Sequence, residues 1–163
     1  MWPSSVHPQP SSIDLAKERK NELKAVTNAL GIESAVNVSS DDIEKTFSTI
    51  IREGYEALLV GSICYSVTHR ERIIDFVVKR RLPAIYTRRT FVEAGLMSYA
   101  ADETDVFRRV ATYIDKILKG SKPAHLPIER PTKFEFVINL KTAKQIGVTI
   151  PPTVLARADW VIK

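Results

Sequence analysis

Short, continuous apolar runs alternate along the chain with segments whose apolar residues recur at helical spacing. The runs EALLVGS, from Glu56, and LPAIYT, from Leu82, have the length of strands and lack the apolar–polar alternation of a half-exposed sheet. Such runs are typical of parallel strands that are covered on both faces. The pattern therefore predicts an α/β fold, with a parallel sheet, helices on both faces and right-handed crossovers.

The same alternation locates the predicted elements. We predict strands near residues 33–38, 56–61 and 83–87, followed by a further strand in LMSYA. Helices should lie between these strands, because the segments that connect them carry apolar stripes at helical spacing. Their ends are marked by residues that cap or stop helices: Ser12, Gly54, Thr68, Gly95, Asp102 and Gly120.

Proline-rich stretches divide the chain into four parts. Residues 1–12 contain three prolines among serines and predict an irregular segment, before an α/β lobe over residues 13–120. Residues 121–131 read as a stiff proline-rich connector. Residues 132–163 form a tail, in which the strand KFEFVIN leads into a short helix that is capped by Asn139 and stopped by Gly147. A tail beyond such a connector is expected to belong to another lobe.

Charge and composition exclude several classes of function. The net charge is +5, but the basic residues are scattered among 19 acidic ones and accompany no nucleic-acid-binding signature, so no nucleic acid is expected as a partner. No apolar run approaches the length of a membrane span, so no membrane insertion is expected. The first residues lack the features of a signal peptide, which predicts a cytoplasmic location for the chain as written. One cysteine excludes an intrachain disulfide.

Motifs for catalysis or cofactor binding are missing from the sequence. There is no phosphate-binding loop, no dinucleotide fingerprint and no nucleophile elbow. The three histidines are far apart and have no carboxylate at a ligand spacing, so no metal or other cofactor is expected. An α/β hydrolase that uses Cys64 or Ser62, with His69 as the base, remains an alternative because these residues share one strand-to-helix loop. A non-enzymatic protein is the main prediction.

Polar and aromatic residues follow each predicted strand. Open parallel sheets bind ligands beyond the carboxyl ends of their strands, so these residues are candidates for contact with a small solute. Arg88 could hold a carboxylate by two parallel hydrogen bonds, and the tyrosines could form aromatic walls. The alternative is that the tyrosines close the edge of the core with their hydroxyl groups in water. The predicted ligand-binding residues are Ser62, Tyr65, Ser66, Tyr86, Arg88, Ser98 and Tyr99.

Two long stretches resemble one protein family. RLPAIYTRRTFVEAGLMSYAAD and ATYIDKILKGSKPAHLPIERPTKFEFVINLKTAKQIGVTIPPTVLARAD are similar to the C-terminal part of ABC-transporter substrate-binding proteins, in the branch that includes tryptophan and tyrosine binders. The resemblance implies two α/β lobes that trap a small solute, such as an amino acid, an ABC permease as partner and a periplasmic location. It also implies that this chain is a second lobe plus tail, with the first lobe and an export signal absent.

The sequence departs from the family pattern at three positions. A double glycine is reduced to Gly95, the glycine after MSY is Ala100, and Trp160 stands where an acid is common. An effector-sensing domain of a transcription regulator would share the two-lobed architecture and is the second alternative. We also expect a homodimer, because an uncovered tail would expose apolar side chains. The residues expected in its interface are Phe134, Phe136, Ile138 and Leu140.

Overall fold

The computed structural model describes residues 21–22, 24–29, 43–61 and 64–163, with the side chains of Cys64 and Tyr65 excepted. The chain divides into two compact units, residues 1–42 and 43–163. In the first unit, the described residues 21–22 and 24–29 are helical. The predicted irregular segment 1–12, the cap at Ser12 and the predicted strand 33–38 lie outside the described residues.

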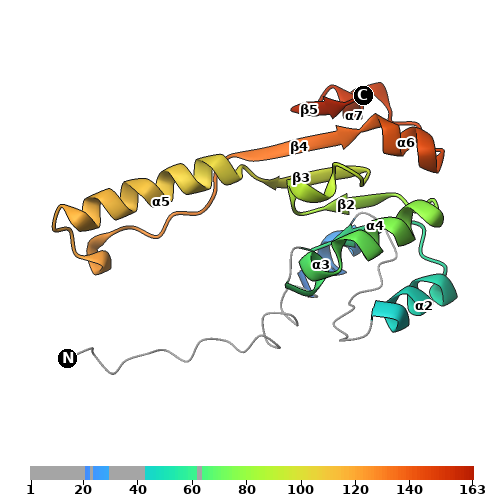
Figure 1. Cartoon of the computed structure of the whole chain (residues 1–163), viewed down its shortest axis with the longest axis horizontal. Helices are drawn as coiled ribbons and strands as arrows, with labels where there is room; N and C mark the ends of the chain where they lie inside the picture. The colour runs from blue at the N-terminus through green and yellow to red at the C-terminus, as the bar shows by residue number, and fades with distance from the viewer. Residues whose placement is uncertain (1–20, 23, 30–42, 62–63) are drawn as a thin grey trace. The chain divides into compact units, whose positions relative to one another are not determined.

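The second unit is built around one five-stranded sheet (Figure 1). Its strands follow each other in the order β1-β2-β3-β4-β5, and all neighbours are parallel except β3 and β4. This arrangement confirms the predicted α/β fold with a mainly parallel sheet. The strands are β1 (Leu58–Val60), β2 (Ala84–Tyr86), β3 (Met97–Ala101), β4 (Phe134–Asn139) and β5 (Trp160–Ile162).

The strand of the predicted tail pairs with β3 in this sheet. β4 runs antiparallel to β3 along the whole length of that strand, from Met97 opposite Ile138 to Ala101 opposite Phe134. Ile138 is fully buried as a result. The connector before β4 therefore returns the chain to the sheet that it left.

Helices and short 3₁₀ turns join the strands. The helix predicted to open at Thr68 is α4, which starts after His69, whose side chain makes no cap hydrogen bond. The short helix α3, which ends at Thr68, was not predicted. The short helix predicted around Thr90 is a 3₁₀ turn. The elements are α2 (Ile43–Glu53), α3 (Cys64–Thr68), α4 (Arg70–Lys79), η1 (Arg89–Phe91), α5 (Glu103–Leu118), η2 (Pro123–His125), α6 (Leu140–Ile146) and α7 (Pro152–Leu155).

Two apolar clusters hold the sheet and helices together. The first joins α4 to β2 and η1 through Ile74, Val77, Ala84, Tyr86 and Phe91. The second joins α6 to β4 and consists of Leu96, Ile138, Ala143, Ile146 and Ile150. Tyr86 is level with Ser98 and Val137, whereas Ile138 is level with Met97 and Ile85. Because alternate residues of a strand point to opposite faces, the two clusters lie on opposite faces of the sheet.

Helix α5 differs from the other long helices because none of its residues is buried. Its apolar residues recur at helical spacing and form a stripe, but all of them are exposed or only partly covered. The exposed members, which we call the α5 stripe, are Phe107, Val110, Ile114, Ile117 and Leu118. A helix normally buries such a stripe against a neighbour.

The connector is fastened to α5 by polar contacts. Arg109 makes two of these contacts. Its Nη1 lies 2.9 Å from Oε2 of Glu129 in the connector, and its Nη2 lies 3.0 Å from Oγ1 of Thr132, just after the connector. The hydroxyl of Tyr113 donates to the Pro127 carbonyl at 2.6 Å. The helix and the connector thus form one segment, held together by these contacts, that leaves the sheet at Asp102 and returns at Lys133. We call it the α5 excursion. Across the described ranges of the chain, no helix combines the length and apolar character that a membrane span requires.

Candidate functional site at the carboxyl edge of the sheet

Three parallel strands end at the same edge of the sheet. β1, β2 and β3 run in one direction, and the amide of Thr87, just after β2, donates to the carbonyl of Val60, the last residue of β1. We call this edge the carboxyl edge and define it by Gly61, Thr87, Arg88, Asp102 and Glu103. It is the edge at which open parallel sheets bind ligands.

Three predicted site residues follow β1. Ser62 lies outside the described residues, and Tyr65 is described only by its backbone in α3. Ser66 is buried, and its hydroxyl donates to the Gly61 carbonyl at 2.6 Å. This hydrogen bond ties the first turn of α3 back to the end of β1. Ser66 therefore shapes the loop at the carboxyl edge.

Tyr86 and Ser98 are fully buried and lie level with each other on neighbouring strands. The ring of Tyr86 stacks on Phe91 with the centroids 5.0 Å apart, and burial raises the pKa of its hydroxyl to about 12. Among the described residues, neither hydroxyl has a hydrogen-bond partner. Both residues pack inside the sheet layer, and the Tyr86 hydroxyl is buried rather than in water, where the alternative interpretation of the tyrosines had placed it.

Arg88 lies at the carboxyl edge and is partly exposed. Its Nε donates to Glu103 Oε1 at 3.2 Å, and its Nη2 is 3.2 Å from the same oxygen. The side chains of the pair are 39% and 53% exposed. Arg88 is therefore accessible to a solute, with a protein carboxylate already beside it. The sequence did not single out Glu103, because an acidic residue in the first turn of a helix is common.

Tyr99 is the exposed tyrosine among the predicted site residues whose side chains are described, at 53% exposure. Its ring is stacked on Phe134, with the centroids 5.4 Å apart and the planes 10° apart, and meets Phe136 edge-on at 6.4 Å. Both phenylalanines come from β4. The sequence placed them in a dimer interface because it gave no sign that β4 pairs with β3.

Asp102 and Lys133 join the two ends of the α5 excursion. The amide of Asp102 donates to the Lys133 carbonyl at 3.0 Å, and Lys133 Nζ lies 2.7 Å from Asp102 Oδ2. The other carboxylate oxygen caps α5 by accepting from the amides of Thr104 and Asp105. The hydrogen bond from Lys133, followed by these amides, lowers the pKa of Asp102, and the same partner raises the pKa of Lys133. The predicted cap at Asp102 is confirmed.

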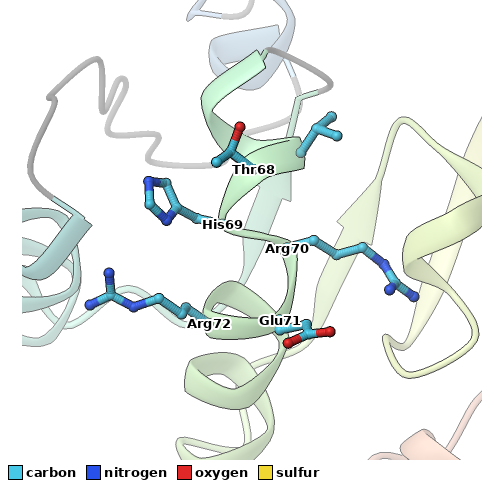
Figure 2. Close-up of a pocket in the computed structure, with 6 residues that line it drawn as sticks. Thr68, His69, Arg70, Glu71 and Arg72 are labelled. Carbon is cyan, nitrogen blue, oxygen red and sulfur yellow. The ribbon is translucent and has the colours of Figure 1, made fainter.

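A hollow lies where α3 meets α4. It is lined by the consecutive residues from Val67 to Arg72. Figure 2 shows that their side chains diverge, since His69 and Arg72 extend to one side and Arg70 to the other. Arg70 is bound to the Thr90 carbonyl through Nε and Nη2. Small-molecule sites need polar groups that converge, so we assign no site here. Within the described ranges, no group of acidic, histidine and cysteine side chains could hold a metal ion.

Comparison with known proteins agrees with the α/β fold. Residues 8–162 match the family model described as ABC transporter substrate binding protein. The chain belongs to this family. Proteins of this family are generally not enzymes, which disfavours the hydrolase alternative.

Solved structures support the same assignment. A conserved domain protein from Vibrio cholerae is 26% identical, with a TM-score of 0.78, over 90% of this chain and 50% of its own length. An ABC domain from Streptococcus pneumoniae, solved in complex with L-Trp, is 28% identical, with a TM-score of 0.78, over 91% of this chain and 51% of its own.

A more distant structure shares the fold alone. It is the ligand-free, open form of a substrate binding protein with adhesive properties from Clostridium difficile, at 15% identity and a TM-score of 0.61 over 94% of this chain and 52% of its own. The chain thus spans about half the length of the structures that it matches. No curated protein matches it.

Proposed function

We propose that the chain supplies one wall of a solute-binding cleft in a two-lobed substrate-binding protein of an ABC importer. The family match over residues 8–162 carries this proposal. The partner would be an ABC permease, and the location would be extracytoplasmic, as in importers of this kind. The solved structures support a second lobe, because each is about twice as long as the matched part.

The α5 excursion is the part that we assign to contact with the second lobe. The chain leaves the sheet at Asp102 and returns at Lys133, and between these residues it presents the α5 stripe uncovered. A stripe of five exposed apolar residues is what a helix presents when its packing partner lies elsewhere. The tail strands pair with each other and with β3 in this sheet, so the contact is assigned to the α5 excursion rather than to the tail.

The solute that we propose is an amino acid or a related carboxylate. The carboxyl edge offers Arg88, whose guanidinium group suits a carboxylate, and the exposed ring of Tyr99 lies on the last strand that ends there. The complex of the Streptococcus pneumoniae protein with L-Trp supports this class of solute. Ser62, Tyr65 and Ser66 remain proposed contacts, while Tyr86 and Ser98 act through packing.

Binding to this chain alone should be weak. Substrate-binding proteins gain affinity by closing two lobes on a solute, and one lobe offers part of the contacts while the cost of immobilising the solute remains. We expect dissociation constants of about a millimolar for L-tryptophan or L-tyrosine. Calorimetry with a panel of free amino acids tests this, with L-tryptophanamide, which lacks the carboxylate, as the control. Equal or absent heats for all of them would contradict the proposed solute class.

We also propose that the chain forms a homodimer through the α5 stripe. A homodimer was expected through the tail, but Ile138 is fully buried and Phe136 and Leu140 are partly buried against the second cluster. The α5 stripe is a better candidate for contact with a second copy when no second lobe covers it. We propose it as the surface that would drive dimer formation.

A further inference from the structure

The contact between Arg88 and Glu103 joins the end of β2 to the start of α5. One carboxylate oxygen of Glu103 lies 3.2 Å from both Nε and Nη2 of Arg88. Nε and the adjacent terminal nitrogen form the edge of a guanidinium that a carboxylate can engage with two parallel hydrogen bonds. Glu103 therefore occupies a carboxylate-binding edge of Arg88 in this structure.

The backbone at both ends of this contact is anchored. Thr87, next to Arg88, is bonded to Val60, and the Arg88 carbonyl accepts from the amide of Phe91 at 3.3 Å. Asp102, next to Glu103, is held by the Lys133 carbonyl and ammonium groups. Separation of the pair therefore requires only side-chain rotation. The two groups are free to part without disturbing the sheet.

A neighbouring ion pair provides a comparison. Arg89 Nη1 lies 2.8 Å from Glu135 Oε2, and the Arg89 guanidinium also lies over the Trp160 ring at 5.6 Å. The Glu135 side chain is 19% exposed, against 53% for Glu103. The Arg88 pair is the more solvated of the two, and solvated ion pairs exchange partners at little cost. A solute carboxylate can thus replace Glu103 more easily than it can replace Glu135.

We propose that Glu103 is a specificity-determining residue, which occupies Arg88 until a solute carboxylate takes its place. This inference rests on the proposed function and deepens it, because it requires a carboxylate on the solute. A solute without a carboxylate leaves the Arg88–Glu103 pair intact and gains nothing from the arginine.

The test compares two variants and two probes by NMR titration of the isotope-labelled chain. Glu103→Gln keeps the shape of the side chain and removes the competing charge, and Glu135→Gln does the same at the neighbouring pair. L-tryptophan carries the carboxylate, whereas L-tryptophanamide lacks it. We expect Glu103→Gln to bind L-tryptophan about two- to fivefold more tightly than the unmodified chain, the range that an exposed ion pair supplies. Its binding of L-tryptophanamide should be unchanged, and Glu135→Gln should behave like the unmodified chain.

Each other outcome counts against the inference. If Glu103→Gln binds L-tryptophan no more tightly, Glu103 does not compete for Arg88, although the proposed function stands as long as L-tryptophan binds. An equal gain for L-tryptophanamide, or in Glu135→Gln, would show a general effect of charge. If L-tryptophan binds neither the unmodified chain nor Glu103→Gln, the inference and the proposed solute class both fail.

Discussion

The ring of Tyr86 lies directly against Gly95, so that a Cβ atom at position 95 would fall 2.4 Å from Cε2 of the ring and 2.8 Å from the Phe91 carbonyl oxygen. Both neighbours are fixed, since Tyr86 is fully buried and stacked on Phe91. The close approach explains why a side chain is excluded between β2 and β3.

Gly95→Ala should therefore destabilise the fold. The added methyl group forces the Tyr86 ring or the η1 backbone to move, and overpacking of this kind costs about 1–3 kcal/mol in the free energy of unfolding. Urea denaturation followed by circular dichroism measures the change. Gly61→Ala is the matched control, because a Cβ at position 61 meets no atom within 4 Å. Equal effects of the two substitutions would show that the contact with Tyr86 is unimportant.

Tyr86→Phe should leave stability unchanged or raise it by up to about 1 kcal/mol, because it removes a buried hydroxyl that lacks a partner among the described residues. The matched control is Tyr113→Phe, which removes the hydrogen bond to the Pro127 carbonyl.

Tyr86→Phe should also change how the free energy of unfolding depends on pH. The pKa of Tyr86 is about 12 in the folded chain and 10.0 for an ordinary tyrosine, so the folded state holds this proton more tightly.

The contribution of the protonated Tyr86 hydroxyl to the free energy of unfolding is fully present below pH 10. It is lost as the pH rises from about 10 to 12. Over that interval, the unmodified chain should lose about 2–3 kcal/mol more than Tyr86→Phe. Chemical denaturation of both proteins at a series of pH values in this range measures the difference. Parallel curves for the two proteins would contradict the burial of the hydroxyl.

Asn139 should be important for stability. It is buried, its Oδ1 caps α6 by accepting from the amides of Lys141 and Thr142, and its Nδ2 donates to the carbonyls of Val92 and Glu93. Asn139→Ala should lower the free energy of unfolding by about 2–4 kcal/mol through loss of the cap and of these bonds. Asn139→Ser keeps the cap alone, so its free energy of unfolding should lie between those of the unmodified chain and Asn139→Ala. If Asn139→Ser were as stable as the unmodified chain, the hydrogen bonds to the Val92 and Glu93 carbonyls would contribute nothing to stability.

Ile114→Lys should reduce self-association without loss of folding. Ile114 lies in the α5 stripe and is exposed, so a lysine there interrupts the apolar surface at no packing cost. Sedimentation velocity at several concentrations measures the change. Ile128→Lys is the control, because Ile128 is fully exposed and lies outside the stripe. If the dimer persists in Ile114→Lys but dissociates in Phe134→Lys, the interface lies in the tail and not on the α5 stripe.

Local signals in the sequence predicted local structure well. Asp102 caps α5 and Asn139 caps α6, as their position before helical segments indicated, and Gly147 ends α6 in the left-handed conformation at φ 78°. These features depend on residues that are close in the chain. The start of α4 was placed at Thr68, because the residues from Thr68 to Glu71 have the pattern of a capping box, whereas the helix starts after His69, whose side chain makes no cap hydrogen bond.

Long-range partners could not be read from the sequence. The apolar pattern of β4 predicts a strand that other elements cover but does not show which sheet it joins, and the register of Met97 with Ile138 decides it. For the same reason, the apolar spacing along α5 predicts a helix but not what covers its stripe. Tyr86 and Tyr99 both lie near strand ends, yet the first is fully buried and the second is 53% exposed, a difference set by Phe91 and Gly95.

The central claim is that the carboxyl edge is the solute-binding wall of this chain. Titration of the isotope-labelled chain with L-tryptophan, followed by backbone amide NMR, tests it most directly. We predict shifts in fast exchange, with a dissociation constant of about a millimolar, at the amides of Thr87, Arg88, Tyr99 and Glu103. The amides near Ile114, far along α5, should not move. Shifts confined to residues away from the carboxyl edge, or none up to the solubility limit of L-tryptophan, would contradict the claim.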